Sequence, residues 1–248
     1  MLRPAVGDVR RHLGQRTFEA DELEDVKARF LREAETAGRL NHHNIVTIYD
    51  VGEEQELAYI AMDYLQGRDL SHHKQPDTLL PLATLLDIAI QVATALDFAH
   101  RHDVVHRDIK PANIIYDETS GDAKVTDFGV ACLTSSSRTK TGTMLGSPSY
   151  MSPEQVSGSK VDGSSDLFSL GVTLYQLSTG KLPFVSDTMA GLAHKICNEN
   201  PPDIRKLRSD IPACLVRIIN KSMQKQKDNR YKSGAQMAKS LRQCRETL

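Results

Sequence analysis

The 248-residue sequence predicts a mixed α+β protein in which a small α/β part precedes a larger, mostly helical part. Three observations support this prediction: an apolar stripe at helical spacing, two β-rich runs directly after it, and helical patterns interrupted by prolines in the second half. The composition is 40% hydrophobic and 25% charged, with a formal net charge of −1. These values are typical of a globular protein and argue against a disordered chain or a strongly basic nucleic-acid binder.

The small part begins with a predicted helix over about 19–40. Apolar residues recur there at steps of three and four, and Glu33 lies beside that stripe. Two runs rich in branched and aromatic residues follow at 45–51 and 56–65, and the polar sequence Gly-Glu-Glu-Gln separates them. Together they predict a β-hairpin. Residues 1–17 show no clear period, and we assign no element to them.

A long amphipathic helix over 82–100 opens the second part, because leucines and alanines recur on one of its faces. The stretch 79–99 is the most apolar in the chain, but Asp87, Gln91 and Asp97 interrupt it. We therefore expect it to be a buried helix and expect no membrane-spanning segment.

Two short strands are predicted next, over 113–116 and 123–126, joined by a Ser-Gly-Asp turn. The stretch 130–164 is rich in Ser, Thr and Gly, which indicates a long loop. From Asp166 onward the pattern is mostly helical.

The two predicted strands lie between the most informative motifs of the sequence. His-Arg-Asp-Ile-Lys-Pro-Ala-Asn occupies 106–113, and Asp-Phe-Gly follows at 127–129. In order and at this spacing, the two motifs resemble the protein-kinase superfamily, with its pattern H-R-D-x4-N followed by D-F-G. The run GSPSYMSPEQ at 146–155 is similar to the end of the activation segment of bacterial, Hanks-type serine/threonine kinases.

The resemblance implies a two-lobed protein-kinase-like fold. The small lobe would cover 1–65 and the mostly helical large lobe 66–248, with a catalytic loop at 106–113 and an activation segment at 127–154. The implied activity is transfer of the γ-phosphate of ATP to serine and threonine hydroxyls of proteins, in bacterial signalling.

The chemistry of phosphoryl transfer suits the motif residues. A hard cation on the phosphates requires oxygen ligands, and Asn113 and Asp127 supply them from the two arms of one hairpin. By resemblance these two residues hold Mg²⁺, Asp108 is the catalytic base, and Lys110 contacts the γ-phosphate.

Other positions match the nucleotide site of the family. Glu33 resembles the helix-C glutamate that pairs with the nucleotide lysine, and Met62 resembles the gatekeeper. Asp63 and Leu65 then fall at the hinge, where their backbone groups would bond the adenine ring of ATP.

Three further residues resemble structural positions of the family. Asp166 would brace the catalytic loop from a buried helix, and Glu154 and Arg230 would form the ion pair that anchors the activation segment in the large lobe.

Two parts of the family's nucleotide site have no counterpart in this sequence. It contains no G-x-G-x-x-G, and Lys27 is the only lysine before Lys74, so the V-A-I-K strand is missing. A complete small-lobe sheet also does not fit ahead of Glu33. We therefore expect a truncated small lobe in a truncated or mis-started chain, with reduced or no activity alone. The alternative is a pseudokinase that acts as a protein-interaction scaffold.

The expected partners are protein substrates with Ser or Thr, and a second kinase molecule that phosphorylates hydroxyls within 134–143. A Ser/Thr-rich loop that is only flexible and solvated is an equally weighted alternative for that segment. We expect no nucleic-acid partner.

Four cysteines lie far apart without a C-x-x-C pattern, and the charged N-terminus does not resemble a signal peptide. These features favour free thiols in a reducing, cytoplasmic setting.

Overall fold

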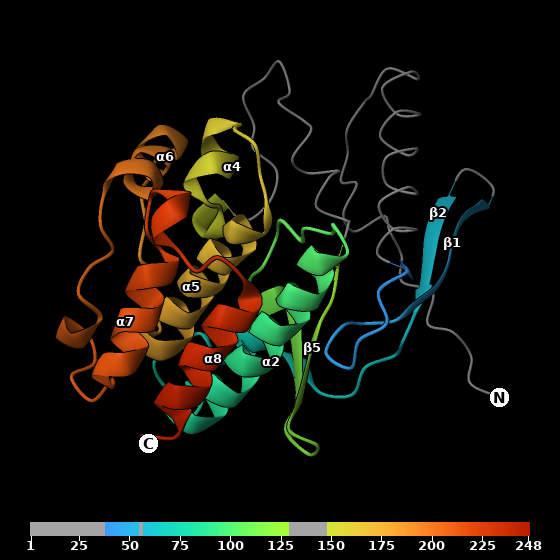
Figure 1. The fold of residues 1–248 in the computed structure, drawn as a ribbon, viewed down its shortest axis with the longest axis horizontal. Helices are drawn as coiled ribbons and strands as arrows, with labels where there is room; N and C mark the ends of the chain where they lie inside the picture. Colours follow the sequence, from blue (N-terminus) through green and yellow to red (C-terminus); the bar gives the residue numbers. More distant parts are fainter. Residues whose placement is uncertain (1–37, 55–56, 129–147) are drawn as a thin grey trace.

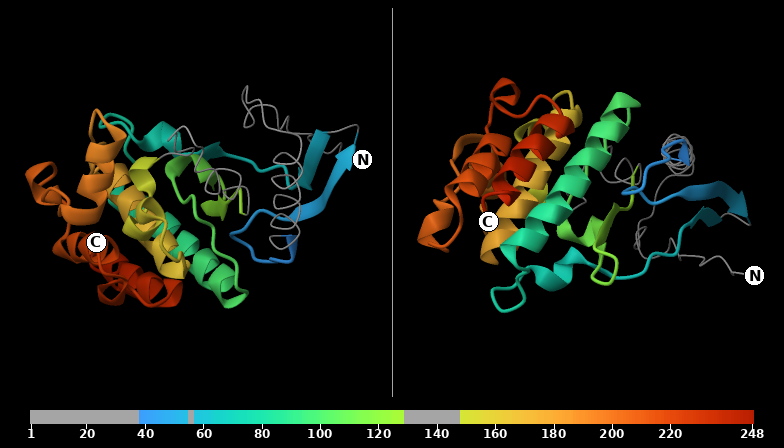
Figure 2. Two further views of the ribbon diagram at one scale, coloured as in Figure 1. Left: turned by 90° about the horizontal axis from the view of Figure 1, so that it is seen from above. Right: turned by 60° about the horizontal axis from the view of Figure 1, so that its bottom comes forward.

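The computed structural model describes residues 38–54, 57–128 and 148–248 (Figure 1). A two-stranded hairpin lies at one side, and a group of packed helices forms the other (Figures 1 and 2). The expected α+β, two-lobed protein-kinase-like architecture is therefore confirmed. Glu33, nearly all of the helix predicted over 19–40, and the hydroxyl residues at 134–143 lie outside the described residues.

The hairpin consists of β1 (Ile48–Glu54) and β2 (Leu57–Met62), which pair antiparallel with Gly52 opposite Tyr59. The prediction of a hairpin is confirmed, but its first strand begins and ends three residues later than predicted, and its second strand is shorter. Ile45 and Val46 do not belong to it, because they pair with a strand of the large lobe.

Ile45 and Val46 pair with the edge of a three-stranded sheet in the large lobe. Its order is β3 (Arg68–Asp69), β4 (Ile114–Asp117) and β5 (Asp122–Val125). The Val46 amide donates to the Val125 carbonyl at 3.0 Å, and the Val125 amide donates to the Asn44 carbonyl at 2.9 Å. The small lobe is therefore hydrogen-bonded directly to the hairpin that precedes Asp127.

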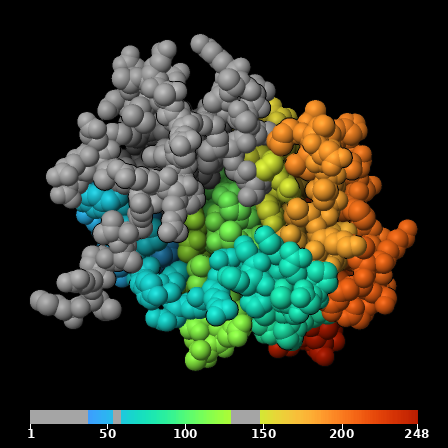
Figure 3. Space-filling view, turned by 180° about the vertical axis from the view of Figure 1, so that it is seen from behind, coloured from blue at the N-terminus to red at the C-terminus, as the bar shows by residue number. Residues whose placement is uncertain are grey.

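The segment between the lobes passes close to β4. Gly67 has a φ of +98°, and a Cβ at this position would lie 2.2 Å from the Tyr116 carbonyl oxygen. Only glycine accommodates both the left-handed backbone and this approach. Viewed from behind, the segment after β2 forms the cyan surface between the blue hairpin and the orange C-terminal half (Figure 3).

The core of the large lobe is built around α2 (Leu82–Arg101), which packs against α5 (Gly163–Thr179) and α8 (Gly234–Arg245). The predicted helix is confirmed, one residue longer than expected. By length and composition α2 is the one described helix that could cross a membrane. Its core-facing side chains, such as Leu86 and Val92, are fully buried by protein, as in a core helix.

The predicted loop over 130–164 is wrong for much of its described part, although residues 158–162 are irregular as expected. A 3₁₀ turn, η4 (Pro148–Tyr150), is followed by α4 (Pro153–Ser157), and α5 already begins at Gly163. The Ser152 hydroxyl and the Gln155 side chain form a capping box, with proline at the first helical position, so S-P-E-Q was a readable helix start.

The remaining elements complete the large lobe. They are the helices α6 (Met189–Asn198) and α7 (Ala213–Ser222) and the 3₁₀ turns η2 (Leu70–His73), η3 (Pro111–Asn113), η5 (Ile204–Lys206) and η6 (Lys227–Asn229).

The expectation of free thiols is wrong for two of the four cysteines. Cys214, in α7, and Cys244, in α8, form a disulfide across 30 residues of sequence, whereas Cys197 is free. The ends of the two helices meet only in the folded chain, so sequence spacing gave no indication of the pair. Cys132 lies outside the described residues.

Candidate active site

Three predicted site residues meet in the loop that leads into β4. The Lys110 Nζ lies 2.6 Å from Asp108 Oδ2, and Asn113 Nδ2 donates to the Asp108 carbonyl at 2.8 Å and to Asp108 Oδ2 at 3.1 Å. The Asp108 side chain stays 26% exposed and that of Lys110 18%. One carboxylate is thus held in position by a cation and an amide while remaining reachable from solvent.

The backbone on either side of this cluster is strained. Arg107 has a φ of +68° and Asp127 a φ of +62°, in the left-handed region that non-glycine residues seldom adopt. Such conformations persist only where surrounding contacts enforce them, and they gather at functional sites. The chain therefore changes direction sharply just before Asp108 and at Asp127, which lie in two separate segments.

Asp166, at the start of α5, enforces the first of these conformations. Its carboxylate is fully buried and accepts from the backbone amides of His106 at 2.9 Å and Arg107 at 2.7 Å, and Oδ2 also lies 2.7 Å from His100 Nε2. Burial opposes ionisation, but the bonds from His100 and the nearby His106 outweigh it and lower the pKa of Asp166. The predicted bracing role is confirmed by this geometry.

His106 joins the catalytic loop to the segment that carries Asp127. Its Nε2 lies 2.7 Å from the Thr126 carbonyl oxygen, and its ring meets the buried Phe128 edge-on at 4.5 Å. The Thr126 amide donates to the Asn113 carbonyl at 3.0 Å. Asn113 and Asp127 are therefore carried by one bonded unit, as the motif spacing suggested.

The donor set fits a divalent cation. The two hydrogen bonds that the Asn113 side chain makes to described residues both use Nδ2, so within the described part of the chain its carbonyl oxygen Oδ1 remains as a ligand. Among the described residues, no hydrogen bond or ion pair engages the Asp127 carboxylate. One amide oxygen and one carboxylate are the hard oxygen ligands that Mg²⁺ uses beside phosphate.

The predicted hinge follows β2. The Asp63 amide donates to the Thr47 carbonyl at 3.0 Å, and among the described residues no hydrogen bond engages the Asp63 carbonyl. The Asp63 carboxylate accepts from the Tyr49 hydroxyl at 2.5 Å; burial raises its pKa, but this bond and those from Thr47 lower it overall. Leu65 is half-buried two residues further on.

The predicted ion pair at the end of the activation segment is also present. Arg230 is buried and binds Glu154 through two nitrogens, at 2.7 and 2.9 Å, and the Ser165 hydroxyl donates to the same carboxylate at 2.5 Å. The guanidinium also lies 4.9 Å from the centre of the Phe168 ring. Phe168 thus packs on the buried cation.

Two contributors were missed from the sequence. His100 bonds the buried Asp166, and Gln155 Nε2 donates to the Arg107 carbonyl at 2.7 Å, so α4 holds the strained residue from the other side. Neither has a readable signal, because both act on positions that are close only in the fold.

Comparison with known proteins agrees with this geometry. The sequence matches the protein kinase domain family over residues 12–242. It is 39% identical over 215 residues to a probable serine/threonine-protein kinase PknB of Lactococcus lactis, which covers 86% of this chain and 34% of that protein. It is 38% identical to the serine/threonine-protein kinase PrkC of Bacillus subtilis, over 86% of this chain and 33% of that protein.

A third relative, the serine/threonine-protein kinase pkn3 of Myxococcus xanthus, is 42% identical over 209 residues. The chain spans about a third of the length of these curated relatives. The chain belongs to the protein kinase domain family, in its bacterial, Hanks-type serine/threonine branch.

Proposed function

We propose that this chain transfers the γ-phosphate of Mg²⁺-bound ATP to serine or threonine hydroxyls of protein substrates. The observation that carries the proposal is the Asp108–Lys110–Asn113 cluster, set beside Asp127 by the bond between Thr126 and Asn113. Membership of the protein kinase family supports the same reaction, since the family generally uses ATP and a divalent metal.

Each side chain has a distinct task. Asp108 accepts a hydrogen bond from the incoming hydroxyl and takes its proton, which is the work of a general base. Lys110 has three donors, of which one binds Asp108, so the others can contact the transferred phosphoryl group. Asn113 Oδ1 and the Asp127 carboxylate would hold Mg²⁺, which neutralises charge on the phosphate oxygens.

The backbone carbonyl of Asp63 and the amide of Leu65 would bond the adenine ring. Glu33, which lies outside the described residues, would belong to the nucleotide site as the counterpart of the helix-C glutamate. The proposed setting is cytoplasmic, where ATP is abundant.

The test is phosphate transfer from radiolabelled Mg·ATP to a generic Ser/Thr-containing protein and to the chain itself. Asp108→Asn should lower the rate by about 10²–10⁴-fold, because it removes the base without changing size. Asp187→Asn, at an exposed aspartate of the large lobe, is the matched control and should retain the rate. Equal rates in the two variants would overturn the assignment of Asp108.

The absence of G-x-G-x-x-G and of the V-A-I-K lysine from the sequence keeps a second candidate open, a pseudokinase scaffold. Loss of one electrostatic contact to the transition state costs about 10²–10³-fold in rate, so a slow kinase and a pseudokinase must be separated by measurement. Transfer that requires Asp108 supports a slow kinase. No transfer and no thermal stabilisation by Mg·ATP, together with capture of a protein partner, supports the scaffold.

A further inference from the structure

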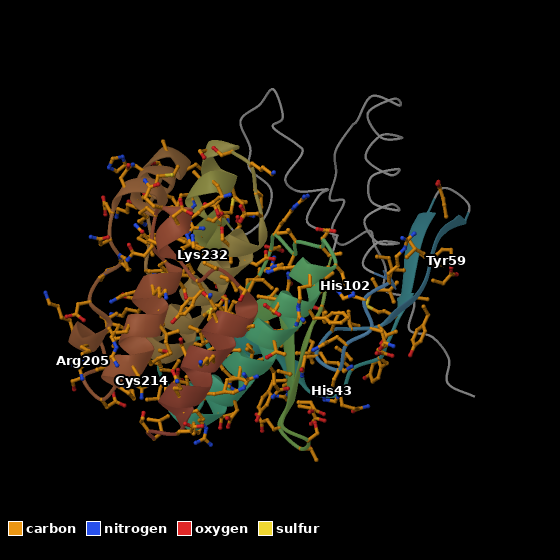
Figure 4. The ribbon with its side chains drawn as sticks, in the orientation of Figure 1. His43, Tyr59, His102, Arg205, Cys214 and Lys232 are labelled. Carbon is orange, nitrogen blue, oxygen red and sulfur yellow. A yellow bond between two sulfur atoms is a disulfide. The ribbon has the colours of Figure 1, made fainter. Side chains whose placement is uncertain are left out.

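A covalent link lies away from the proposed site, at the far end of the large lobe. It joins Cys214, the second residue of α7, to Cys244, in the last turn of α8. Figure 4 labels Cys214 on α7, near the C-terminal end of the chain. Nothing in phosphoryl transfer requires a link at this position.

We propose that Cys214 and Cys244 are a site of reversible oxidation, which in the reduced chain reacts with a low-molecular-weight disulfide of the glutathione type. The Cys214 thiolate attacks one sulfur of the glutathione disulfide and releases one glutathione thiolate. The Cys244 thiolate then attacks the Cys214 sulfur of the mixed disulfide and releases the second. The protein dithiol loses two electrons and two protons, and one glutathione disulfide becomes two thiols.

The order of attack follows from the two environments. Cys214 is half-buried and lies in the first turn of α7, where the helix dipole favours a thiolate. The Thr247 hydroxyl oxygen lies 3.6 Å from the Cys214 sulfur, and its hydrogen is donated to the Cys244 carbonyl at 2.7 Å. Cys244 is only 1% exposed, at the carbonyl end of α8, so a dissolved disulfide reaches Cys214 first and Cys244 closes the link.

The link encloses the element that anchors the activation segment. Arg230 lies between the two cysteines in sequence, and its guanidinium holds Glu154 of α4. Cross-linking residues 30 apart removes loop-closure entropy from the unfolded chain and so stabilises the fold that contains Arg230. Oxidation should therefore strengthen this part of the large lobe without contacting the catalytic residues.

The first measurement compares the chain after reduction, and after removal of the reductant and incubation with glutathione disulfide. The oxidised protein should be about 2 Da lighter, with no retained glutathione. Alkylation should label Cys197 but neither Cys214 nor Cys244 after oxidation, whereas all three should be labelled in the reduced chain. Full labelling after oxidation, or a stable glutathione adduct at Cys214, would overturn the proposal.

The second measurement is stability. The thermal midpoint of the oxidised chain should exceed that of the reduced chain by roughly 5–10 °C, and amides around Arg230 should exchange more slowly. Equal midpoints and equal exchange would show that the link does not support the anchor. This comparison uses the unaltered chain in two buffers, so it does not depend on any variant folding.

Two variants complete the test. Cys214→Ser should show no difference between the two buffers, because Cys244 is left without a partner. Cys197→Ser is the matched control, since Cys197 is half-buried and free, and it should respond as the unaltered chain does. A response that disappears in Cys197→Ser and persists in Cys214→Ser would contradict the assignment. All of these readouts are independent of kinase activity.

Discussion

The catalytic loop and the layer beneath it both use ionisable side chains, but they treat them in opposite ways. The Asp108 side chain is 26% exposed, whereas those of Asp166 and Arg230 are fully buried. Among the described residues, the Asp108 carboxylate is bonded only by Lys110 and Asn113. Asp166 and Arg230 instead make several hydrogen bonds each to buried groups of the protein. We call Asp108 and its two neighbours the upper layer, and the buried Asp166, Glu154 and Arg230 with their partners the lower layer. The difference implies that substitutions in the upper layer lower the reaction rate, whereas substitutions in the lower layer first lower the free energy of unfolding.

The largest effect on stability is expected from Arg230→Met. It leaves Glu154 buried without its cation, which costs about 3–5 kcal/mol for a buried pair broken on one side. Chemical denaturation should show this loss in the free energy of unfolding. If the variant and the unaltered chain unfold at the same denaturant concentration, the lower layer is not the stabilising one.

A smaller effect is expected from His100→Phe, which removes the side-chain bond to the Asp166 carboxylate. Hydrogen bonds to charged groups contribute about 1.5–3 kcal/mol, and the rate should also fall because Asp166 positions the His106 and Arg107 amides. His100→Gln can restore a donor and should recover part of both. His72→Gln, at an exposed histidine, is the control; equal losses in the two positions would contradict a specific role for His100.

The lower layer should also give a defined acid response. Burial raises the pKa of Glu154, but hydrogen bonds from Arg230 and Ser165 outweigh it, so the folded-state pKa lies below its ordinary value of 4.5. As the pH falls, Glu154 of the unfolded chain therefore binds a proton before Glu154 of the folded chain does. The stability that this group contributes above its unfolded-state pKa is lost as the pH falls through its folded-state pKa. Thermal midpoints from pH 7 to 3 should drop more steeply for the unaltered chain than for Glu154→Gln. Parallel curves would argue against this coupling.

The smallest effect is expected at an exposed pair. Lys232 Nζ lies 2.9 Å from Asp228 Oδ1, with side chains 57% and 98% exposed. Solvent screens such a pair, so Lys232→Ala should change the free energy of unfolding by less than about 0.5 kcal/mol. Urea titration can measure this change in the free energy of unfolding. A loss above about 1 kcal/mol would mean that exposure does not distinguish the Lys232–Asp228 pair from the buried Arg230–Glu154 pair.

Predictions from the sequence were most accurate where a single short segment contains the whole periodicity or the whole motif. The helix over 82–100 and the cluster at 106–113 were foreseen because helical periodicity and the H-R-D-x4-N spacing are local properties. The hairpin was predicted, but its first strand begins later than expected, because Ile45 and Val46 pair with β5 and this pairing depends on the fold.

Contacts between distant segments were out of reach without a resemblance. His100 and Asp166 are 66 residues apart, and Cys214 and Cys244 are 30 apart. The Glu154–Arg230 pair was expected only because the family has one there. No periodicity in a single sequence encodes which of its charges or thiols meet.

The pairing of Asn44 and Val46 with Val125 has a mechanical consequence. Force applied to the β1–β2 hairpin is transmitted through two backbone hydrogen bonds to β5, and Asp127 lies only two residues beyond Val125. The Asn44 side-chain amide, through Nδ2, also donates to the Ala123 carbonyl at 2.9 Å and to Gln91 Oε1 of α2 at 2.7 Å, so this junction is attached to the core as well. A rotation of the hairpin about this pivot would move its outer end widely and would move Asp127, the proposed metal ligand, very little.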